Sequence, residues 1–206
     1  MRRVIVVVAL VAAAGAIAAD NAPPEGFTAL FNGKDLTGWG TRDGKPATAQ
    51  QVAEWKVEDG IIKYTGKDGD LWTTKSYKDF VLMVEWKMDK PADSGIYVRG
   101  SSKCQANIWD NKLGSGEVYG YRTDAKMPEE VRKAATPSKK ADKPLGEWNA
   151  FVITVKGDRM TVELNGEKVI DNLQMVGCPA DGPIALQNHG QPLDFKNIYI
   201  KELKAE

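Results

Sequence analysis

The chain has 206 residues, of which 28 are lysine or arginine and 28 are aspartate or glutamate, so its formal charge is balanced. A protein that binds nucleic acid needs an excess of positive charge, so this composition argues against a nucleic-acid partner. The length suits one β-sandwich domain with a full hydrophobic core.

The first 18 residues have the pattern of a secretory signal peptide. A basic pair, Arg2-Arg3, precedes an apolar stretch over 4–17, and Ala16-Ile17-Ala18 offers a cleavage site. We therefore predict a signal peptide over 1–18, one domain over 19–206, and a periplasmic or secreted protein. The apolar stretch is short for a membrane span and no cysteine follows it, so we expect no stable membrane anchor, with an uncleaved anchor as the alternative. Removing the two arginines from the 28 basic residues leaves 26 against 28 acidic residues.

Turn-forming dipeptides recur at short intervals, and the runs between them have strand character. These runs are residues 55–58, 61–64, 80–88, 151–155, 160–164, 168–170 and 198–203. The pattern predicts an all-β domain of antiparallel strands, either a sandwich or a jelly roll. Asn165-Gly166 separates two of the runs and predicts a tight hairpin, because a primed turn needs the positive φ that Asn-Gly adopts at little cost.

Two consecutive predicted strands, 95–99 and 104–109, each have an apolar and a polar face. The period of two places these apolar side chains on the inner face: Ile96, Val98, Cys104, Ala106 and Ile108. It places these polar and aromatic side chains on the outer face: Tyr97, Arg99, Gln105, Asn107 and Trp109. Amides and a guanidinium can bind neighbouring sugar hydroxyls, and an indole can cover the apolar face of a pyranose ring. The outer face is thus predicted to bind a sugar, with an ordinary solvated sheet face as the alternative.

A candidate for proton transfer follows later in the chain. His189 is the only histidine, and Gln187 lies on the same predicted face. An imidazole can move a proton near neutral pH, so we predict a catalytic His189 and a substrate-binding Gln187, with a structural histidine as the alternative. Glu117 adds a further candidate substrate contact, and Glu85, Asp110 and Glu117 could instead form a pair of glycosidase carboxylates. The sequence has no second histidine and no acidic calcium loop, so it predicts no particular metal site.

Two features leave alternatives open. Residues 125–144 are predicted to be an insertion with a short helix near the rim of the sheet, either a lid over the polar face or a solvated loop. Cys104 and Cys178 are the only cysteines, and they either form a disulfide or remain two buried thiols.

Four ordered blocks of the sequence carry a resemblance to a known family. The blocks are residues 26–39, 94–100, 146–149, and 182–190 together with 194–203. They resemble the 3-keto-disaccharide hydrolase family, also described as 3-keto-glucoside 1,2-lyase and 3-keto-2-hydroxyglucal hydratase domains. The resemblance covers nearly all of the mature chain and implies a concanavalin-like, laminin-G-like jelly-roll sandwich whose concave sheet carries the site.

The resemblance also implies a reaction. A separate sugar 3-dehydrogenase would first oxidise the sugar at C3, and the resulting ketone acidifies the hydrogen at C2. A base then removes that proton, the aglycone leaves C1 by β-elimination, and water addition completes net hydrolysis. The resemblance implies no certain cofactor and leaves open a divalent metal ion on the keto and enol oxygens. A non-catalytic carbohydrate-binding module on the same fold is the alternative function.

Overall fold

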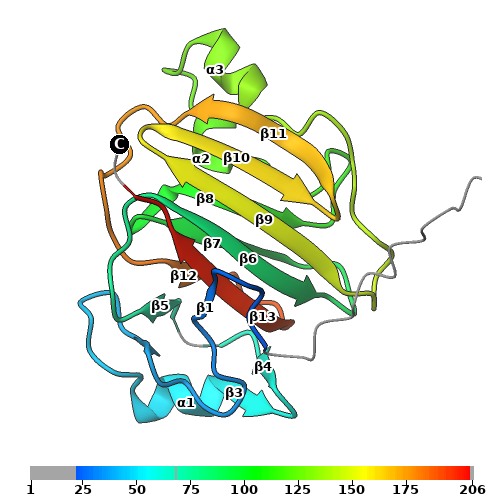
Figure 1. The fold of residues 1–206 in the computed structure, drawn as a ribbon. Coiled ribbons are helices and arrows are strands. Elements are labelled where there is room, and N and C mark those ends of the chain that lie inside the picture. Colours follow the sequence, from blue (N-terminus) through cyan, green and yellow to red (C-terminus); the bar gives the residue numbers. More distant parts are fainter. Residues whose placement is uncertain (1–21, 68, 205–206) are drawn as a thin grey trace, which may run out of the picture.

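The computed structural model describes residues 22–67 and 69–204, and the expected signal peptide lies outside these residues. Two antiparallel sheets form a sandwich (Figure 1). The larger sheet has the order β11-β10-β9-β6-β13-β4-β3, with β1 paired to β13, and the smaller sheet has the order β2-β5-β12-β7-β8. The predicted all-β sandwich is confirmed.

Four of the five described strands with eight or more residues lie in the larger sheet. The larger sheet contains β1 (Thr28–Ala29), β3 (Trp55–Glu58), β4 (Ile61–Tyr64), β6 (Phe80–Lys87), β9 (Asn149–Lys156), β10 (Arg159–Leu164), β11 (Glu167–Gln174) and β13 (Leu193–Glu202). The smaller sheet contains β2 (Trp39–Gly40), β5 (Leu71–Thr73), β7 (Asp93–Val98), β8 (Ser101–Trp109) and β12 (Ala185–Leu186). Three short helices complete the fold: α1 (Ala49–Glu54), α2 (Tyr119–Arg122) and α3 (Glu129–Ala134).

The hydrophobic core fills the space between the two sheets. Leu82 and Phe151 of the larger sheet join the same buried cluster as Leu186 of the smaller sheet. The predicted inner residues of β7 and β8 also belong to it, each with 0% of its surface exposed: Ile96, Val98, Cys104, Ala106 and Ile108. The period-two alternation is therefore confirmed for the inner face of these two strands.

The predicted hairpin is confirmed as well. Strands β10 and β11 pair directly, with Leu164 opposite Glu167. The two residues between them, Asn165 and Gly166, have φ values of 54° and 82°. Both values lie in the left-handed region that a primed two-residue turn requires.

The segment 125–144 carries α3 and runs along one end of the sandwich (Figure 1). Ser138 N–H donates to the carbonyl of Val169 on β11 at 2.9 Å. Farther along, Lys140 Nζ donates to the carbonyl of Asn111 at 2.8 Å, in the loop that follows β8. The segment thus joins the edge strand of the larger sheet to a loop of the smaller sheet.

Cys104 and Cys178 form a disulfide, with Cα atoms 6.3 Å apart and a sequence separation of 74 residues. The bond attaches β8 to the segment that follows β11. Closing a loop of this length stabilises a fold by about 4 kcal/mol through the entropy of the unfolded chain.

We expect Cys178→Ser to lower the melting temperature of the protein, because the variant loses this constraint on the unfolded chain. Thermal melting with and without dithiothreitol measures the effect. The reductant should lower the melting temperature of the wild type and leave that of the variant unchanged. A wild-type melting temperature that is insensitive to reduction would contradict the bond.

Candidate functional site

The outer face of the smaller sheet gathers most of the predicted site residues in rows that cross the strands. The first row is set by the strand register, in which Ala185 lies opposite both Trp72 and Tyr97, and Tyr97 lies opposite Gln105. The rings of Trp72 and Tyr97 are tilted, with centroids 5.7 Å apart. With Ala185 they form a small apolar cluster separate from the main core. This row places an aromatic surface beside an amide.

The second row contains two amides on either side of a glycine. Gln187 N–H donates to the Gly95 carbonyl at 2.9 Å, and Gly95 lies opposite Asn107 on β8. A Cβ atom at position 95 would lie 2.9 Å from Gln105 Oε1 and 3.1 Å from Gln187 Oε1. Glycine is needed here because the two amide oxygens converge above the backbone where a side chain would be.

The two converging amide oxygens are buried acceptors without a partner. The Gln105 and Gln187 residues are 5% and 9% exposed. Neither Oε1 atom accepts a hydrogen bond from any residue that the structure describes. An unpaired buried acceptor costs about 1–3 kcal/mol, so its retention on a polar face points to a ligand that donates hydrogen bonds.

The third row contains the candidate for proton transfer. Asp93 lies opposite Trp109, and the Asp93 carboxylate is 3.9 Å from His189 Nδ1. These three side chains border a surface pocket of about 240 Å³. The His189 side chain is 53% exposed, so the imidazole is accessible from solvent.

The Asp93 carboxyl has an unusual electrostatic environment. Burial raises its pKa above the ordinary value, and the charge of Glu117 raises it further. His189 and the Asn107 side chain act in the opposite direction, because both stabilise the carboxylate. A carboxyl with a raised pKa next to an accessible imidazole is an arrangement typical of acid-base sites.

Glu117 reaches this face from the loop that follows β8. Its carbonyl accepts from Asn107 N–H at 2.9 Å, which aligns the loop with the edge of the sheet. The Glu117 side chain is 0% exposed, pairs with Arg122, and accepts from Asn107 Nδ2 at 3.4 Å. Glu117 is thus buried behind the amides and paired with Arg122.

The opposite end of the face, at β5, carries polar groups as well. Arg42 lies over the Trp72 ring at 5.3 Å from its centroid. The Asp70 carboxylate accepts from Asn188 N–H at 2.8 Å, which fixes the backbone between Gln187 and His189. Burial raises the pKa of the Tyr97 hydroxyl above its ordinary range, and nearby Asp70 and Asp93 add to this effect, so Tyr97 stays a proton donor.

Arg99 does not belong to this face, which corrects the prediction from the sequence. The alternation ends at Val98, because Arg99 and Gly100 have positive φ values and form the turn into β8. The Arg99 guanidinium donates to the carbonyls of Lys78 and Gly157 at 2.8 and 2.7 Å and pairs with the Asp79 carboxylate. Arg99 is 3% exposed and holds three backbone segments together at the end of the sheet.

The carboxylate pairs considered from the sequence do not assemble either. Glu85 lies on β6 in the other sheet, where it accepts from Asn197 at 3.0 Å. Glu117 is sealed by Arg122, and Asp110 lies 3.4 Å from Lys140. Among the residues that the structure describes, no group of three His, Cys, Asp or Glu side chains is placed to hold a metal ion.

The structure therefore brings seven of the eight predicted site residues to one region: Tyr97, Gln105, Asn107, Trp109, Glu117, Gln187 and His189. Sequence reasoning missed Asp93, which the same alternation would have placed on the face two residues before Gly95. It also missed Asp70 and Trp72, because β5 has only three residues and gives little periodic signal.

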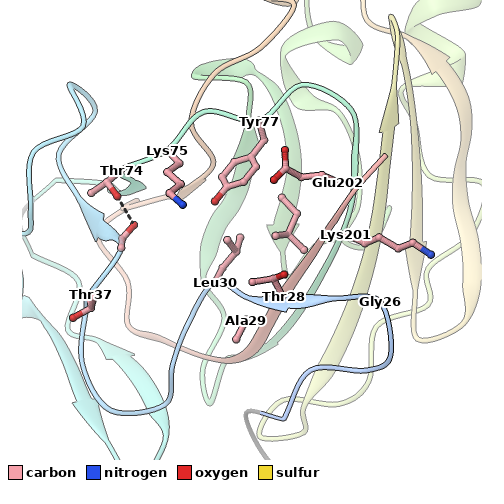
Figure 2. Close-up of a pocket in the computed structure, with 12 residues that line it drawn as sticks. Gly26, Thr28, Ala29, Leu30, Thr37, Thr74, Lys75, Tyr77, Lys201 and Glu202 are labelled. Atoms are coloured by element: carbon pink, nitrogen blue, oxygen red, sulfur yellow. Dashed lines mark hydrogen bonds between the residues drawn. The ribbon is translucent and has the colours of Figure 1, made fainter. Parts of the chain in front are cut away.

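A second surface pocket, of about 310 Å³, lies beside β1 and the end of β13, away from the polar face. Figure 2 shows Leu30, Tyr77 and Glu202 among the residues that line it. None of the predicted site residues borders this pocket. In the described part of the chain, no helix has the length and apolar character needed to cross a membrane.

Comparison with known proteins gives a consistent result. Residues 26–201 match the family described as the 3-keto-alpha-glucoside-1,2-lyase-like domain. Over 237 aligned positions, the chain is 26% identical to a 3-keto-disaccharide hydrolase of Bacteroides thetaiotaomicron, with 87% of this chain and 79% of that protein covered.

Solved structures show the same architecture. A protein from Parabacteroides distasonis, described as a candidate glycosyl hydrolase, is 26% identical and matches with a TM-score of 0.67, covering 90% of this chain and all of that one. SCLam, a non-specific endo-β-1,3(4)-glucanase of family GH16, matches with a TM-score of 0.52 at 12% identity, covering 89% and 93% of the two chains. The second likeness concerns the fold alone and agrees with a concanavalin-like jelly roll.

Proposed function

The chain belongs to the 3-keto-alpha-glucoside-1,2-lyase-like domain family, a family of glycoside-cleaving enzymes that act on 3-keto sugars, and from this premise we propose a reaction and a site. The substrate is a 3-keto-glycoside, which is cleaved by β-elimination followed by water addition. The observation that carries the proposal is the pair of unpartnered amide oxygens of Gln105 and Gln187 beside the Asp93–His189 pair.

The residues on the face can perform each step. His189 removes the proton at C2, which the C3 ketone acidifies, and the electron pair of the C–H bond moves toward the ketone as an enolate. Tyr97 donates a hydrogen bond to the enolate oxygen, and Asp93 stabilises the imidazolium that forms. When the enolate returns to a ketone, a C1–C2 double bond forms and the bond from C1 to the aglycone oxygen breaks. That oxygen takes the proton from the His189 imidazolium, which regenerates the neutral base. Water then adds its hydroxyl at C1 and its hydrogen at C2.

The cellular setting of this reaction is also part of the proposal. An exported protein in an oxidising compartment can keep the Cys104–Cys178 disulfide, and this bond supports the periplasmic or secreted location expected from residues 1–18. The ketone at C3 requires an earlier oxidation of the sugar, so we expect a separate sugar 3-dehydrogenase to supply the substrate.

The direct test is incubation of the purified protein with 3-keto-trehalose, 3-keto-lactose and the two unoxidised disaccharides. We expect release of the free aglycone sugar from the keto substrates only, because only a C3 ketone acidifies C2. Mass spectrometry of the products measures this. Binding of the keto sugars without any product would instead favour the non-catalytic carbohydrate-binding module.

We expect Gly95→Ala to lower kcat/KM by about tenfold or more. The added methyl group would lie within about 3 Å of both amide oxygens, so at least one amide must turn away from the substrate. Gly69→Ala is the matched control, because a Cβ atom at that position meets no atom within 4 Å. Equal kinetics for the two variants would contradict the assigned role of the amides.

We expect Asp93→Asn to raise the melting temperature at neutral pH while lowering activity. Burial raises the pKa of Asp93, so the folded protein disfavours the ionised carboxylate, and the fold loses stability as the pH rises past the carboxyl's unfolded value. The neutral amide does not carry this cost. Melting curves from pH 3 to pH 7 should show equal melting temperatures for the two proteins at the acidic end and a higher melting temperature for the variant near neutrality. A higher melting temperature of the variant at acidic pH alone would contradict this prediction.

A further inference from the structure

The orientation of the amides on the sheet face is fixed by charged groups behind them. Asn107 is 2% exposed, and its Nδ2 group donates to the Glu117 carboxylate at 3.4 Å. The Asn107 side chain also stabilises the Asp93 carboxylate. A carboxylate only accepts hydrogen bonds, so the nitrogen of Asn107 must face the two carboxylates and its oxygen must face the opposite way.

The orientation of the Asn107 amide also fixes the orientation of the Gln105 amide. The Asn107 Oδ1 atom accepts from Gln105 Nε2 at 3.4 Å, which occupies the donor side of the Gln105 amide. The Gln105 Oε1 atom is then directed to the space above Gly95, where Gln187 Oε1 also lies. The buried Glu117 carboxylate, which is paired with the partly exposed Arg122, therefore sets the hydrogen-bond polarity of an amide on the binding face.

Three acceptor oxygens converge on the position above Gly95. Measured from the position of a Cβ at residue 95, Gln105 Oε1, Gln187 Oε1 and the Ala106 carbonyl oxygen lie at 2.9, 3.1 and 3.2 Å. The two side-chain oxygens have no donor among the described residues. A ketone or ether oxygen placed there would meet other oxygens, whereas a hydroxyl group would supply the missing donor.

We propose that this part of the site is selective for hydrogen-bond donors and binds the sugar through hydroxyl groups that its Gln105 and Gln187 oxygens accept. The proposal rests on the proposed function and deepens it, because it assigns an orientation to the substrate. The hydroxyls of the sugar lie over Gly95, and the C3 ketone is directed away from the two amides, toward the donor Tyr97. Asn107 is a positioning residue, since it acts through Gln105.

The test replaces single hydroxyls of the substrate with fluorine, which keeps the size of the group but cannot donate. Methyl 3-keto-glucoside is compared with its 4-fluoro and 6-fluoro analogues, by kcat/KM and by Kd from tryptophan fluorescence. For the wild type, we expect at least one fluoro analogue to bind tenfold or more weakly than the parent sugar. Fluoro analogues that all bind within about twofold of the parent would overturn the proposal.

Three variants test the origin of the discrimination. Gln105→Met and Gln187→Met each remove one acceptor. For the hydroxyl that this acceptor binds, the ratio of the Kd of the fluoro analogue to the Kd of the parent sugar should fall to less than threefold. Asn107→Leu leaves both glutamines but frees Gln105 to turn, so the discrimination should also fall. Gln50→Met, an exposed substitution on α1, is the matched control and should keep the wild-type ratio. An unchanged ratio in all three site variants would overturn the proposal.

Melting temperatures, kcat/KM and Kd together distinguish a failure of the proposed reaction from a failure of the proposed donor selectivity. Gln187→Met should melt at the wild-type temperature or above, because it removes an unpaired buried acceptor. Gln105→Met removes such an acceptor too, but it also leaves Asn107 Oδ1 without its donor, so its melting temperature should stay close to that of the wild type. Folded variants can then be compared directly. Binding discrimination without turnover would reject the proposed reaction and support donor selectivity. Turnover without discrimination would reject donor selectivity alone, and the absence of both binding and turnover would reject both.

Discussion

Replacing His189 by alanine is expected to lower turnover of a 3-keto-glycoside by about a hundredfold or more, with folding intact. His189 is the only imidazole in the chain, its side chain is half exposed, and its Nδ1 atom lies 3.9 Å from the Asp93 carboxylate. Removing an accessible side chain leaves no cavity in the core, so the melting temperature should stay at the wild-type value. Steady-state kinetics and thermal melting of the same preparation measure both effects.

A second variant tests whether His189 and Asp93 act as a unit. If Asp93 works by stabilising the His189 imidazolium, the double variant His189→Ala with Asp93→Asn should be no slower than His189→Ala alone, because groups that act together are not additive. If the fold-loss of turnover in the double variant equals the product of the losses in the two single variants, the two side chains act independently. Wild-type turnover of His189→Ala would exclude this histidine from the mechanism and transfer the proton-transfer role to Asp93.

Much of this site follows from the alternation of two strands. The inner and outer residues of β7 and β8 were predictable because both strands are long and only one face is apolar and packs in the core between the sheets, so a shift by one residue would place polar groups in that core. The prediction failed at Arg99 because a period of two holds only inside a strand. The chain turns at residues 99–100, and the β7–β8 register shifts between Tyr97 and Val98, so the alternation of the two strands is not continuous across the turn.

Other parts of the site depend on contacts between segments that are distant in the sequence. Asp70 lies immediately before β5, which has only three residues. The Arg122 pair with Glu117 depends on the path of the loop after β8, for which the sequence gives no periodic signal. The sequence could not predict whether the disulfide forms, because a cysteine on the inner face of a strand can be a free thiol or a bonded residue. The answer depends on whether the fold brings Cys178 next to Cys104, as it does here.

Ile108→Asp is expected to abolish the folding of the domain. Ile108 is 0% exposed in the core between the sheets, and an aspartate there would be a charged group without a partner in an apolar environment. The cost exceeds about 4 kcal/mol, against a typical total stability of about 5–15 kcal/mol for a domain. Circular dichroism and the loss of a cooperative melting transition measure the result.

The next residue provides the matched control, because the alternation places it on the other face. Trp109→Asp puts the same side chain at a partly exposed position that borders the pocket with Asp93 and His189. This variant should still melt cooperatively while losing affinity for the sugar. A milder core variant, Ile108→Val, should remain folded and lose about 1 kcal/mol of stability, which gives a measurable value where the aspartate gives none. A folded Ile108→Asp protein would contradict the assignment of this side chain to the core and, with it, the face on which the site is built.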